Sequence, residues 1–252
     1  MKSDLTIIFG ASAGVGKAIA YELAKQGKNL VLAARDLQDL ESIAKHLEIT
    51  NNVEVFPVAV DLESPDFEGK VFLDEIKAVF TKYKIKSLYL TAGIVTENDE
   101  AGFEHELMEK INRINFVGPA SLLNAFISEF KNQNEGEAVV FSTIAAPVPR
   151  KKNIGYTASK NALESFCKSL QHDLADRENI VLQVYRLGYV DTSMSFGQKL
   201  LFPVADPKDV ARFVVKHSNK KSLRFAYYPK FWAFIVFVLK STPWFVYKRL
   251  KF

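Results

Sequence analysis

The sequence predicts an α/β fold: one doubly wound, Rossmann-like domain with a parallel seven-stranded sheet, followed by an apolar, aromatic C-terminal extension. Two observations support this. Short apolar runs alternate with amphipathic stretches of helical period, which is typical of βαβ units. A glycine cluster also follows the first apolar run directly. A chain of 252 residues, 48% of them apolar, is long enough for one large α/β domain with one extended core.

Each predicted strand is a short apolar run. The helices between them are predicted from periodicity: Leu40, Ile43 and Leu47 recur at about 3.6 residues, as do Phe72 and Ile76. Because strands and helices alternate along the whole chain, the sheet is expected to carry helices on both faces. The predicted strands are Leu5–Phe9, Leu30–Ala34, Val53–Val60, Ser87–Leu90, Ala138–Phe141, Ile180–Tyr185 and Leu223–Tyr228.

Composition excludes several classes of function. The net charge is only +4 and the basic residues are spread along the chain, so we expect no nucleic-acid partner. The single cysteine, Cys167, excludes an internal disulfide framework and is expected to be a packed core residue. Glu104–Glu106 is expected to flank a helix, and no metal site is predicted. This composition fits a reducing, cytoplasmic environment.

The glycine cluster lies in the stretch Phe9–Gly16, which reads FGASAGVG. Glycines between a strand and a helix let the backbone turn tightly and approach a pyrophosphate. The start of the helix then offers free N–H groups to the phosphates. We therefore expect a dinucleotide to bind here; the alternative is that the glycines only end the strand.

The residues after the second predicted strand bear on the choice of dinucleotide. An acidic residue there would bind the ribose 2′-hydroxyl, whereas an arginine suits a 2′-phosphate. The chain has Ala34 and then Arg35, which predicts NADP(H) in preference to NAD(H). Asp36 is expected to cap the next helix, which leaves Arg35 able to reach a phosphate.

Tyr156 and Lys160 lie four residues apart in the predicted helix that contains GYTASK, so they share one face. Together with the glycine loop, this Tyr-x-x-x-Lys pair resembles the short-chain dehydrogenase/reductase family, and the resemblance covers residues 5 to about 228. It implies the strand order 3-2-1-4-5-6-7, with a dinucleotide bound across the switch point of the sheet.

The pair has a chemical rationale of its own. Reduction of a carbonyl by hydride leaves negative charge on oxygen, which must be protonated. A phenol titrates near pH 10, and an ammonium one helical turn away favours the phenolate and lowers that pKa. We expect Tyr156 to donate the proton in reduction and Lys160 to tune it, and by resemblance also to hold the nicotinamide ribose. The alternative is a surface tyrosine beside a solvated lysine.

A hydroxyl that holds the substrate carbonyl is expected near Tyr156. The family has a serine thirteen positions before the tyrosine, where this chain has Thr143, and Ser142 is one residue away. Neighbours on a strand point to opposite faces, so the two cannot serve equally. Register favours Thr143 and Ser142 is the alternative, unless both hydroxyls only satisfy backbone groups at the strand end.

The remaining site residues are implied by the resemblance. Asn115 would be the fourth catalytic residue, anchoring a water next to Lys160, with Asn112 as its rival. Thr91 replaces the asparagine of the family's Asn-Ala-Gly turn, and Leu187 replaces the proline of a Pro-Gly pair. The expected cofactor-binding residues are Gly10, Ser12, Ala13, Gly14, Val15, Gly16, Arg35, Asp61, Leu62, Ala92, Gly93, Tyr156, Lys160, Gly188, Val190 and Thr192.

Residues 230–252 differ in composition from the catalytic and dinucleotide-binding region, residues 1–229. Three interpretations of this extension are open: a lid or oligomer interface, a segment in a membrane surface, and a spanning helix. The apolar run Phe231–Leu239 is less than half of the roughly 20 residues that a spanning helix needs, and Lys240 follows it. We favour contact with a membrane surface, with Trp232 and Trp244 at the headgroups, combined with an oligomer interface.

The sequence therefore predicts an NADP(H)-dependent oxidoreductase that transfers a hydride between the nicotinamide and a ketone or secondary alcohol. The apolar segment between Thr192 and Asp206 favours a hydrophobic substrate, such as a 3-oxoacyl, lipid or steroid-like carbonyl. The alternative is a dinucleotide-binding sensor or scaffold with little turnover. Family members commonly pair through the helices that carry Asn115 and Tyr156, so a homodimer or homotetramer is expected, cytoplasmic or peripheral at a membrane.

Overall fold

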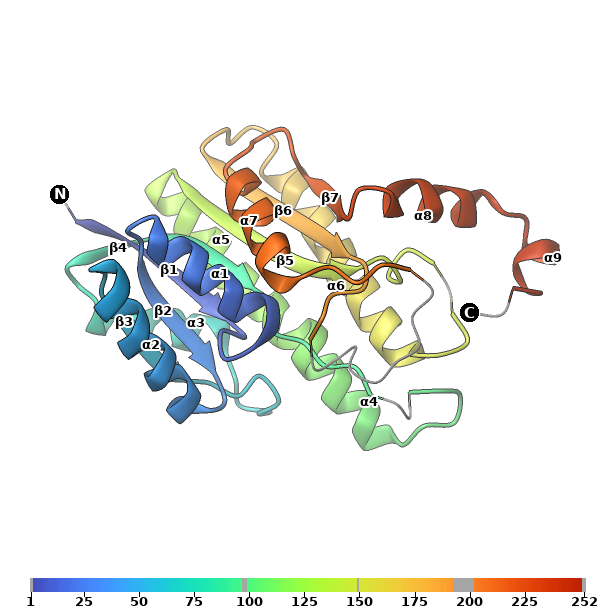
Figure 1. The fold of residues 1–252 in the computed structure, drawn as a ribbon, viewed down its shortest axis with the longest axis horizontal. Coiled ribbons are helices and arrows are strands. Elements are labelled where there is room, and N and C mark those ends of the chain that lie inside the picture. The colour runs from blue at the N-terminus through green and yellow to red at the C-terminus, as the bar shows by residue number, and fades with distance from the viewer. Residues whose placement is uncertain (1, 97–98, 149, 193–201, 251–252) are drawn as a thin grey trace.

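A parallel seven-stranded sheet forms the centre of the molecule (Figure 1). The computed structural model describes residues 2–96, 99–148, 150–192 and 202–250. The strand order β3-β2-β1-β4-β5-β6-β7 confirms the predicted fold class and topology. The strands are β1 (Ser3–Phe9), β2 (Asn29–Ala34), β3 (Val55–Ala59), β4 (Tyr83–Leu90), β5 (Gly136–Thr143), β6 (Ile180–Leu187) and β7 (Phe225–Tyr228).

Helices cover both faces of the sheet, and each face has its own hydrophobic cluster. Side chains alternate between the clusters along the strands: Ile7 of β1 packs on one face and Ile8 on the other. Burial on both faces explains why the strands read as nearly continuous apolar runs. One face carries α1 (Gly14–Lys25), α2 (Leu37–Asn51) and α7 (Pro207–His217); the other carries α3 (Gly69–Val79), α5 (Gly118–Gln133) and α6 (Ile154–Asp173).

Strand β4 begins at Tyr83, four residues before the predicted start at Ser87. The sequence pattern missed this half of the strand because Lys84 and Lys86 interrupt the apolar run. Both lysines form ion pairs with Glu135, which directly precedes the neighbouring strand β5. A carboxylate supplied from the next strand thus allows two cations within a strand of the central sheet.

The carboxyl ends of the central strands meet at one edge and form the site. The chain runs outward from β1 to β2 and β3, then returns to β4 on the other side of β1. Such a reversal leaves a crevice at the carboxyl ends of the strands, where open α/β sheets bind ligands. The glycine loop, residues 91–93, Thr143 and the segment after Leu187 all lie at this edge.

The C-terminal extension is attached through Trp232, the first residue of α8 (Trp232–Ser241). Its side chain is only 4% exposed and packs edge-on against the rings of Tyr189 and Phe202, with centroids 5.7 and 4.7 Å away. Beyond it, α8 and the short α9 (Trp244–Tyr247) project past β7 (Figure 1). None of the helices described has both the length and the apolar composition to cross a membrane.

Candidate active site

The glycine loop brings backbone, not side chains, to the cleft. Gly10 and Gly14 have φ values of +80° and +51°, which L side chains rarely adopt. A Cβ on Gly16 would lie 2.1 Å from the carbonyl oxygen of Gly10, so the helix packs too close to the loop for any side chain. Within the described chain, no side chain caps α1 at Ala13 and no acidic residue occupies its first turn. These free N–H groups and the positive end of the helix dipole suit a phosphate.

The Thr91 side chain forms hydrogen bonds that the sequence did not predict. Its hydroxyl donates to the carbonyl of Phe9 at 2.6 Å and lies 3.2 Å from that of Gly10. It thereby ties the end of β4 to the start of the glycine loop. The replacement of asparagine by threonine therefore retains a bond across the switch point.

The glycine loop forms one wall of a cleft of about 1020 Å³, at the upper end of the usual range for ligand pockets of roughly 300–1,000 Å³. Its size, glycine cradle and exposed helix start fit a dinucleotide, whose nicotinamide would supply or accept the hydride. Asn115 is the one predicted site residue that is fully buried behind the wall. The predicted residues that line the cleft are Gly10, Ser12, Ala13, Gly14, Val15, Gly16, Arg35, Asp61, Leu62, Ala92, Gly93, Ser142, Thr143, Tyr156, Lys160, Gly188, Val190 and Thr192.

The end of the cleft near β2 and β3 has the geometry expected for the adenosine part. The Asp36 carboxylate accepts from the N–H of Asp39 at 3.0 Å and caps α2, as predicted. Arg35 is exposed and lines the cleft, with its guanidinium 3.9 Å from Glu63. The Asp61 carboxylate accepts from the N–H of Glu63 at 2.9 Å.

Asp99 fixes the start of the helix that carries Tyr156 and Lys160. Its two carboxylate oxygens accept from the N–H groups of Gly155 and Tyr156 at 2.6 and 2.7 Å, and its backbone carbonyl accepts from Ile154 at 3.1 Å. A buried carboxylate thus satisfies donors that a helix start leaves unpaired, and it complements the helix dipole. No sequence pattern indicates this cap, because Asp99 precedes Tyr156 by 57 residues.

The phenol of Tyr156 lies at the inner end of the cleft, next to Thr143 and Arg150. Burial raises the pKa of Tyr156, while hydrogen bonding with the Thr143 hydroxyl and the charge of Arg150 lower it. From the sequence, we expected Lys160 to supply the cation and the pKa of Tyr156 to be lowered. The raised pKa keeps the phenol protonated at neutral pH, which is the form that a proton donor needs.

Lys160 is buried directly behind this point. Its ammonium donates to the carbonyl of Phe141 at 3.1 Å, and burial lowers the pKa of Lys160 to about 8, partly offset by the nearby Glu164. A Cβ on Gly93 would lie 3.2 Å from the Lys160 Nζ and 3.1 Å from the Asn115 Oδ1. The glycine at position 93 therefore lets the strand end pass between these two side chains.

Asn115 lies in a π-helical turn, Arg113–Val117, between α4 (His105–Asn112) and α5. Such turns often occur at functional sites. Its amide pairs with both backbone groups of Ile94: Nδ2 donates to the carbonyl at 2.9 Å and Oδ1 accepts from the N–H at 2.8 Å. Asn115 thus holds the chain that follows β4 against the helix.

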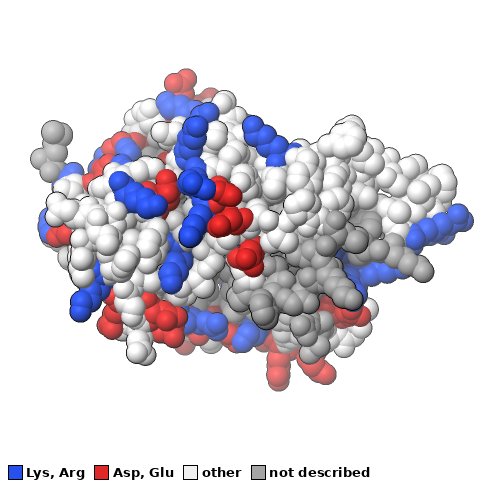
Figure 2. Space-filling view, in the orientation of Figure 1, with Lys and Arg blue, Asp and Glu red and all other residues white. Residues whose placement is uncertain are grey.

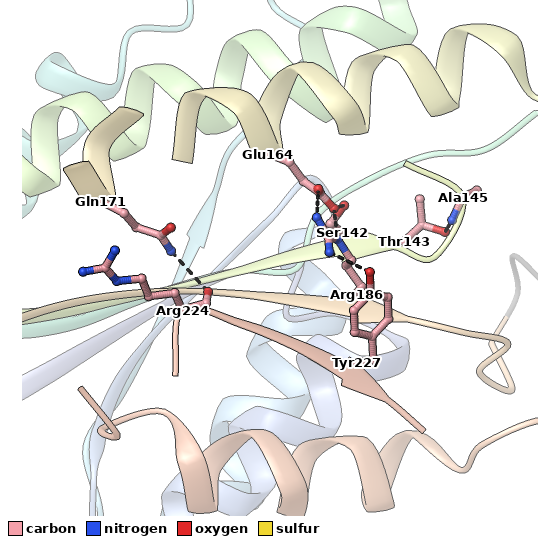
Figure 3. A network of polar contacts seen from close by, with 8 residues as sticks. All are labelled: Ser142, Thr143, Ala145, Glu164, Gln171, Arg186, Arg224 and Tyr227. Atoms are coloured by element: carbon pink, nitrogen blue, oxygen red, sulfur yellow. Dashed lines mark hydrogen bonds and ion pairs between the residues drawn. The ribbon is translucent and has the colours of Figure 1, made fainter. Parts of the chain in front are cut away.

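Ser142 and Thr143 both line the cleft but have different partners. The Ser142 hydroxyl donates to the buried carboxylate of Glu164 at 2.7 Å, and Arg186 holds the same carboxylate with two nitrogens at 2.8 and 2.5 Å. Arg186 also donates to the hydroxyl of Tyr227 at 2.7 Å. Figure 3 shows this network, with Thr143 turned away from it toward Ala145. The Thr143 hydroxyl accepts a hydrogen bond from the N–H of Ala145 at 3.2 Å.

The loop after β6 meets both the glycine loop and the C-terminal extension. A Cβ on Gly188 would lie 2.0 Å from the indole nitrogen of Trp232, so only glycine fits beneath the anchor of α8. The Thr192 methyl would lie 3.0 Å from a Cβ on Gly14. Most of the apolar segment predicted between Thr192 and Asp206 falls outside the described residues, and Phe202 packs on Trp232.

Sequence reasoning missed Asp99, Arg150 and the Glu164–Arg186 pair. Glu164 lies one turn after Lys160, so its place on the same helix face was the one signal available. Arg150 lies in a loop with two further basic residues, where charge alone does not separate a solvated side chain from one in the cleft. Cys167 is a buried core residue, as predicted.

The comparisons with known proteins agree with this geometry. A family model described as short chain dehydrogenase matches residues 4–199, so the chain belongs to this family. It is 30% identical over 247 residues to hydroxysteroid 11-beta-dehydrogenase 1-like protein A of Xenopus laevis, covering 95% of this chain and 82% of the relative. It is 27% identical to an uncharacterized oxidoreductase of Staphylococcus saprophyticus, covering 85% and 91% of the two chains.

Solved structures share the fold at low identity. A short-chain dehydrogenase from Sphingobium yanoikuyae in complex with NADPH superimposes with a TM-score of 0.81 at 20% identity, covering 98% of this chain and 96% of that one. An alcohol dehydrogenase from Thermococcus sibiricus complexed with 5-hydroxy-NADP gives 0.77 at 24%, covering 90% and 96%. The protein is therefore an oxidoreductase of the short-chain dehydrogenase/reductase family, which uses a nicotinamide dinucleotide on alcohols or ketones.

Proposed function

We propose that the protein is an NADP(H)-dependent reductase of ketones, in which Tyr156 donates the proton and Thr143 holds the carbonyl oxygen. The single observation that carries this proposal is the meeting of Tyr156 and Thr143 at the inner end of the cleft, beyond the glycine loop. Lys160 would hold the nicotinamide ribose. Asn115 would fix the chain beside it, through Ile94, and anchor a water next to Lys160.

The same site supplies the groups that reduction of a ketone needs. Because burial raises the pKa of Tyr156, the phenol enters the reaction protonated and can neutralise the oxygen on which charge develops. The Thr143 hydroxyl is better placed than that of Ser142 to hold this oxygen, since Ser142 already donates to Glu164. The expected NADP(H) cofactor, acting as hydride donor, favours reduction of a ketone over oxidation of an alcohol.

Arg35 supports the choice of NADP(H). It lines the end of the cleft next to the loop after β2, and its long 3.9 Å contact with Glu63 leaves it able to turn to a 2′-phosphate. Structural neighbours solved with NADPH and with 5-hydroxy-NADP are consistent with this choice. The binding residues would be those predicted from the sequence, from Gly10 to Thr192.

The substrate is proposed to be largely hydrophobic, such as a 3-oxoacyl, lipid or steroid-like carbonyl. The side chains of Ile94, Val95 and Tyr189 give the cleft wall near Tyr156 an apolar character. The name of the Xenopus laevis relative, a hydroxysteroid dehydrogenase-like protein, is in line with a hydrophobic ketone.

The C-terminal extension is proposed to lie in a membrane surface, which would make the protein peripheral to a membrane from the cytoplasmic side. Phe234 and Phe237 are 71% and 67% exposed, and Trp244 and Phe245 continue this apolar surface. From Arg224 to Phe252 the sequence contains several lysines and arginines but no Asp or Glu, which suits anionic lipid. Figure 2 shows this end of the molecule as a largely uncharged lobe edged by basic residues. A homodimer or homotetramer through the helices that carry Asn115 and Tyr156 is proposed from the family, and the mass of the protein in solution would test it.

The first prediction concerns turnover. Tyr156→Phe should lower NADPH-dependent ketone reduction at least about a hundredfold, because the proton donor is lost, while NADPH affinity changes little. Thr143→Ala should reduce kcat/KM more than Ser142→Ala. Rates are measured by NADPH absorbance over a ketone panel, and affinity by fluorescence titration.

Full activity of Tyr156→Phe would exclude the proposed mechanism. The absence of turnover by the wild type, with tight NADPH binding, would favour a dinucleotide sensor or scaffold instead. A larger loss in Ser142→Ala than in Thr143→Ala would assign the hydroxyl to Ser142.

The second prediction concerns cofactor choice. Arg35→Ser should reduce the NADPH-over-NADH preference in Kd by about tenfold or more, as expected for loss of a charged hydrogen bond to the 2′-phosphate. Lys45→Gln removes an exposed cation of α2 outside the cleft and should leave the preference unchanged. Equal wild-type affinities for NADPH and NADH would contradict the role of Arg35.

The third prediction concerns the extension. The double variant Phe234→Ser, Phe237→Ser should bind phosphatidylserine-containing vesicles at least about tenfold more weakly in co-sedimentation. The reason is that two aromatic side chains are no longer transferred from water into the lipid surface. Ile49→Ser, at an equally exposed apolar residue of α2, is the matched control. Failure of the wild type to bind these vesicles would exclude the membrane role and leave the lid or interface.

A further inference from the structure

Arg150 provides a charged group at the substrate end of the cleft that the reaction as proposed does not use. It lies in the loop between β5 and α6 and lines the same cleft as Thr143 and Tyr156. The side chain therefore faces the reacting groups and not bulk solvent alone.

Arg150 is half-buried, and within the described part of the chain its guanidinium has no hydrogen-bond or ion-pair partner. Its Nε is buried with no hydrogen-bond partner, and no described carboxylate forms an ion pair with it. The neighbouring Lys152, by contrast, lies 3.7 Å from Glu100 on the surface. An unsatisfied buried donor is costly, and more so when it is charged, so a ligand that satisfies it gains binding energy.

Among the described residues, the carboxylates that line the cleft or adjoin Tyr156 have other partners, and Asp99 accepts from the start of α6. Asp36 and Asp61 line its distant, adenosine end, where each accepts a backbone N–H. Glu164 is held by Arg186 and Ser142 behind the sheet end. The charge of Arg150 lowers the pKa of both Tyr156 and Tyr247, against the effect of burial.

We propose that Arg150 is a substrate-binding residue that pairs with a carboxylate, so that the preferred substrates are keto acids with an apolar body. A guanidinium is charged at all relevant pH values, and its planar fork matches the two oxygens of a carboxylate. The apolar wall at Ile94 and Val95 would take the hydrocarbon part. This inference rests on the proposed function, and it replaces a uniformly hydrophobic substrate by an amphipathic one.

The test compares straight-chain keto acids of increasing length, each with its own methyl ester. The wild type should reduce the acid of best length with a higher kcat/KM than its ester. In Arg150→Gln, the acid-to-ester ratio of kcat/KM should fall about tenfold or more. The effect of Arg150 on Tyr156 acts on both compounds equally, so it cancels in this ratio and leaves the carboxylate contact.

Two variants control for charge and folding. Lys151→Gln removes an exposed neighbouring cation and should leave the ratio within about twofold, since screening weakens surface charges. Arg150→Lys keeps the charge without the fork and should give an intermediate ratio. Melting temperatures identify any variant that fails to fold. If Arg150→Gln does not fold, the acid-to-ester ratio of kcat/KM of the wild-type protein decides the test.

The outcomes separate this inference from the proposed function. Tyr156-dependent reduction of esters with no preference for any acid would overturn the role of Arg150 and leave the reductase intact. If no ketone is reduced, binding of the acid and of its ester to the NADPH-loaded protein is measured by calorimetry. Equal affinity of the wild type for acid and ester would overturn the inference. So would an equal loss of affinity for both compounds in Arg150→Gln. Tighter binding of the acid that Arg150→Gln abolishes supports it.

Discussion

The carboxylate of Asp99 determines where α6 begins, and with it the position of the groups at the inner end of the cleft. Three consecutive N–H groups at the helix start, those of Ile154, Gly155 and Tyr156, donate to this one residue. The next N–H, of Thr157, donates to the carbonyl of Asn153. This last contact is the first bond within the helix, so Asp99 satisfies three of the four donors that a helix start leaves free. Gly155 allows the approach, since a Cβ there would lie 3.1 Å from the Asp99 oxygen.

A second set of polar contacts fixes the same helix further along. Glu164 receives Ser142 from β5 and Arg186 from β6, and Arg186 reaches Tyr227 on β7. Removal of one partner from such a buried ion pair is costly, because it leaves an uncompensated charge. The network also engages one of the two hydroxyls at the end of β5: Ser142 donates to Glu164, which leaves the hydroxyl of Thr143 for Tyr156. The strand that precedes the extension is therefore connected to the site through side chains.

The parts of the site that depend on local patterns could be predicted. The glycine loop, the Tyr156–Lys160 pair and the cap at Asp36 are each set by residues within a few positions of one another, so periodicity and spacing suffice. The fold class and strand order followed from alternation and family resemblance. The bond from Ser142 to Glu164, which supports the proposed preference for Thr143, is a tertiary contact that no local pattern indicates.

The direction of the pKa shift of Tyr156 could not be predicted for the same reason. Helix geometry places Lys160 near the phenol, but burial is a property of the assembled cleft, and it outweighs the contributions of Thr143 and Arg150. Asp99 and Arg150 lie in loops without periodicity, so only the folded chain brings them to α6. Lys84 and Lys86 hid the first half of β4 because their partner, Glu135, is also distant in sequence.

The most direct test of this account is the single-turnover rate of hydride transfer from NADPH in Asp99→Asn. An asparagine can accept only one of the two bonds and opposes the other N–H with its own donors, so the start of α6 should shift. The account predicts a rate at least about tenfold slower, with NADPH affinity within about twofold of wild type, and no change in the exposed neighbour variant Glu100→Gln. A folded Asp99→Asn protein that transfers hydride at the wild-type rate would contradict it.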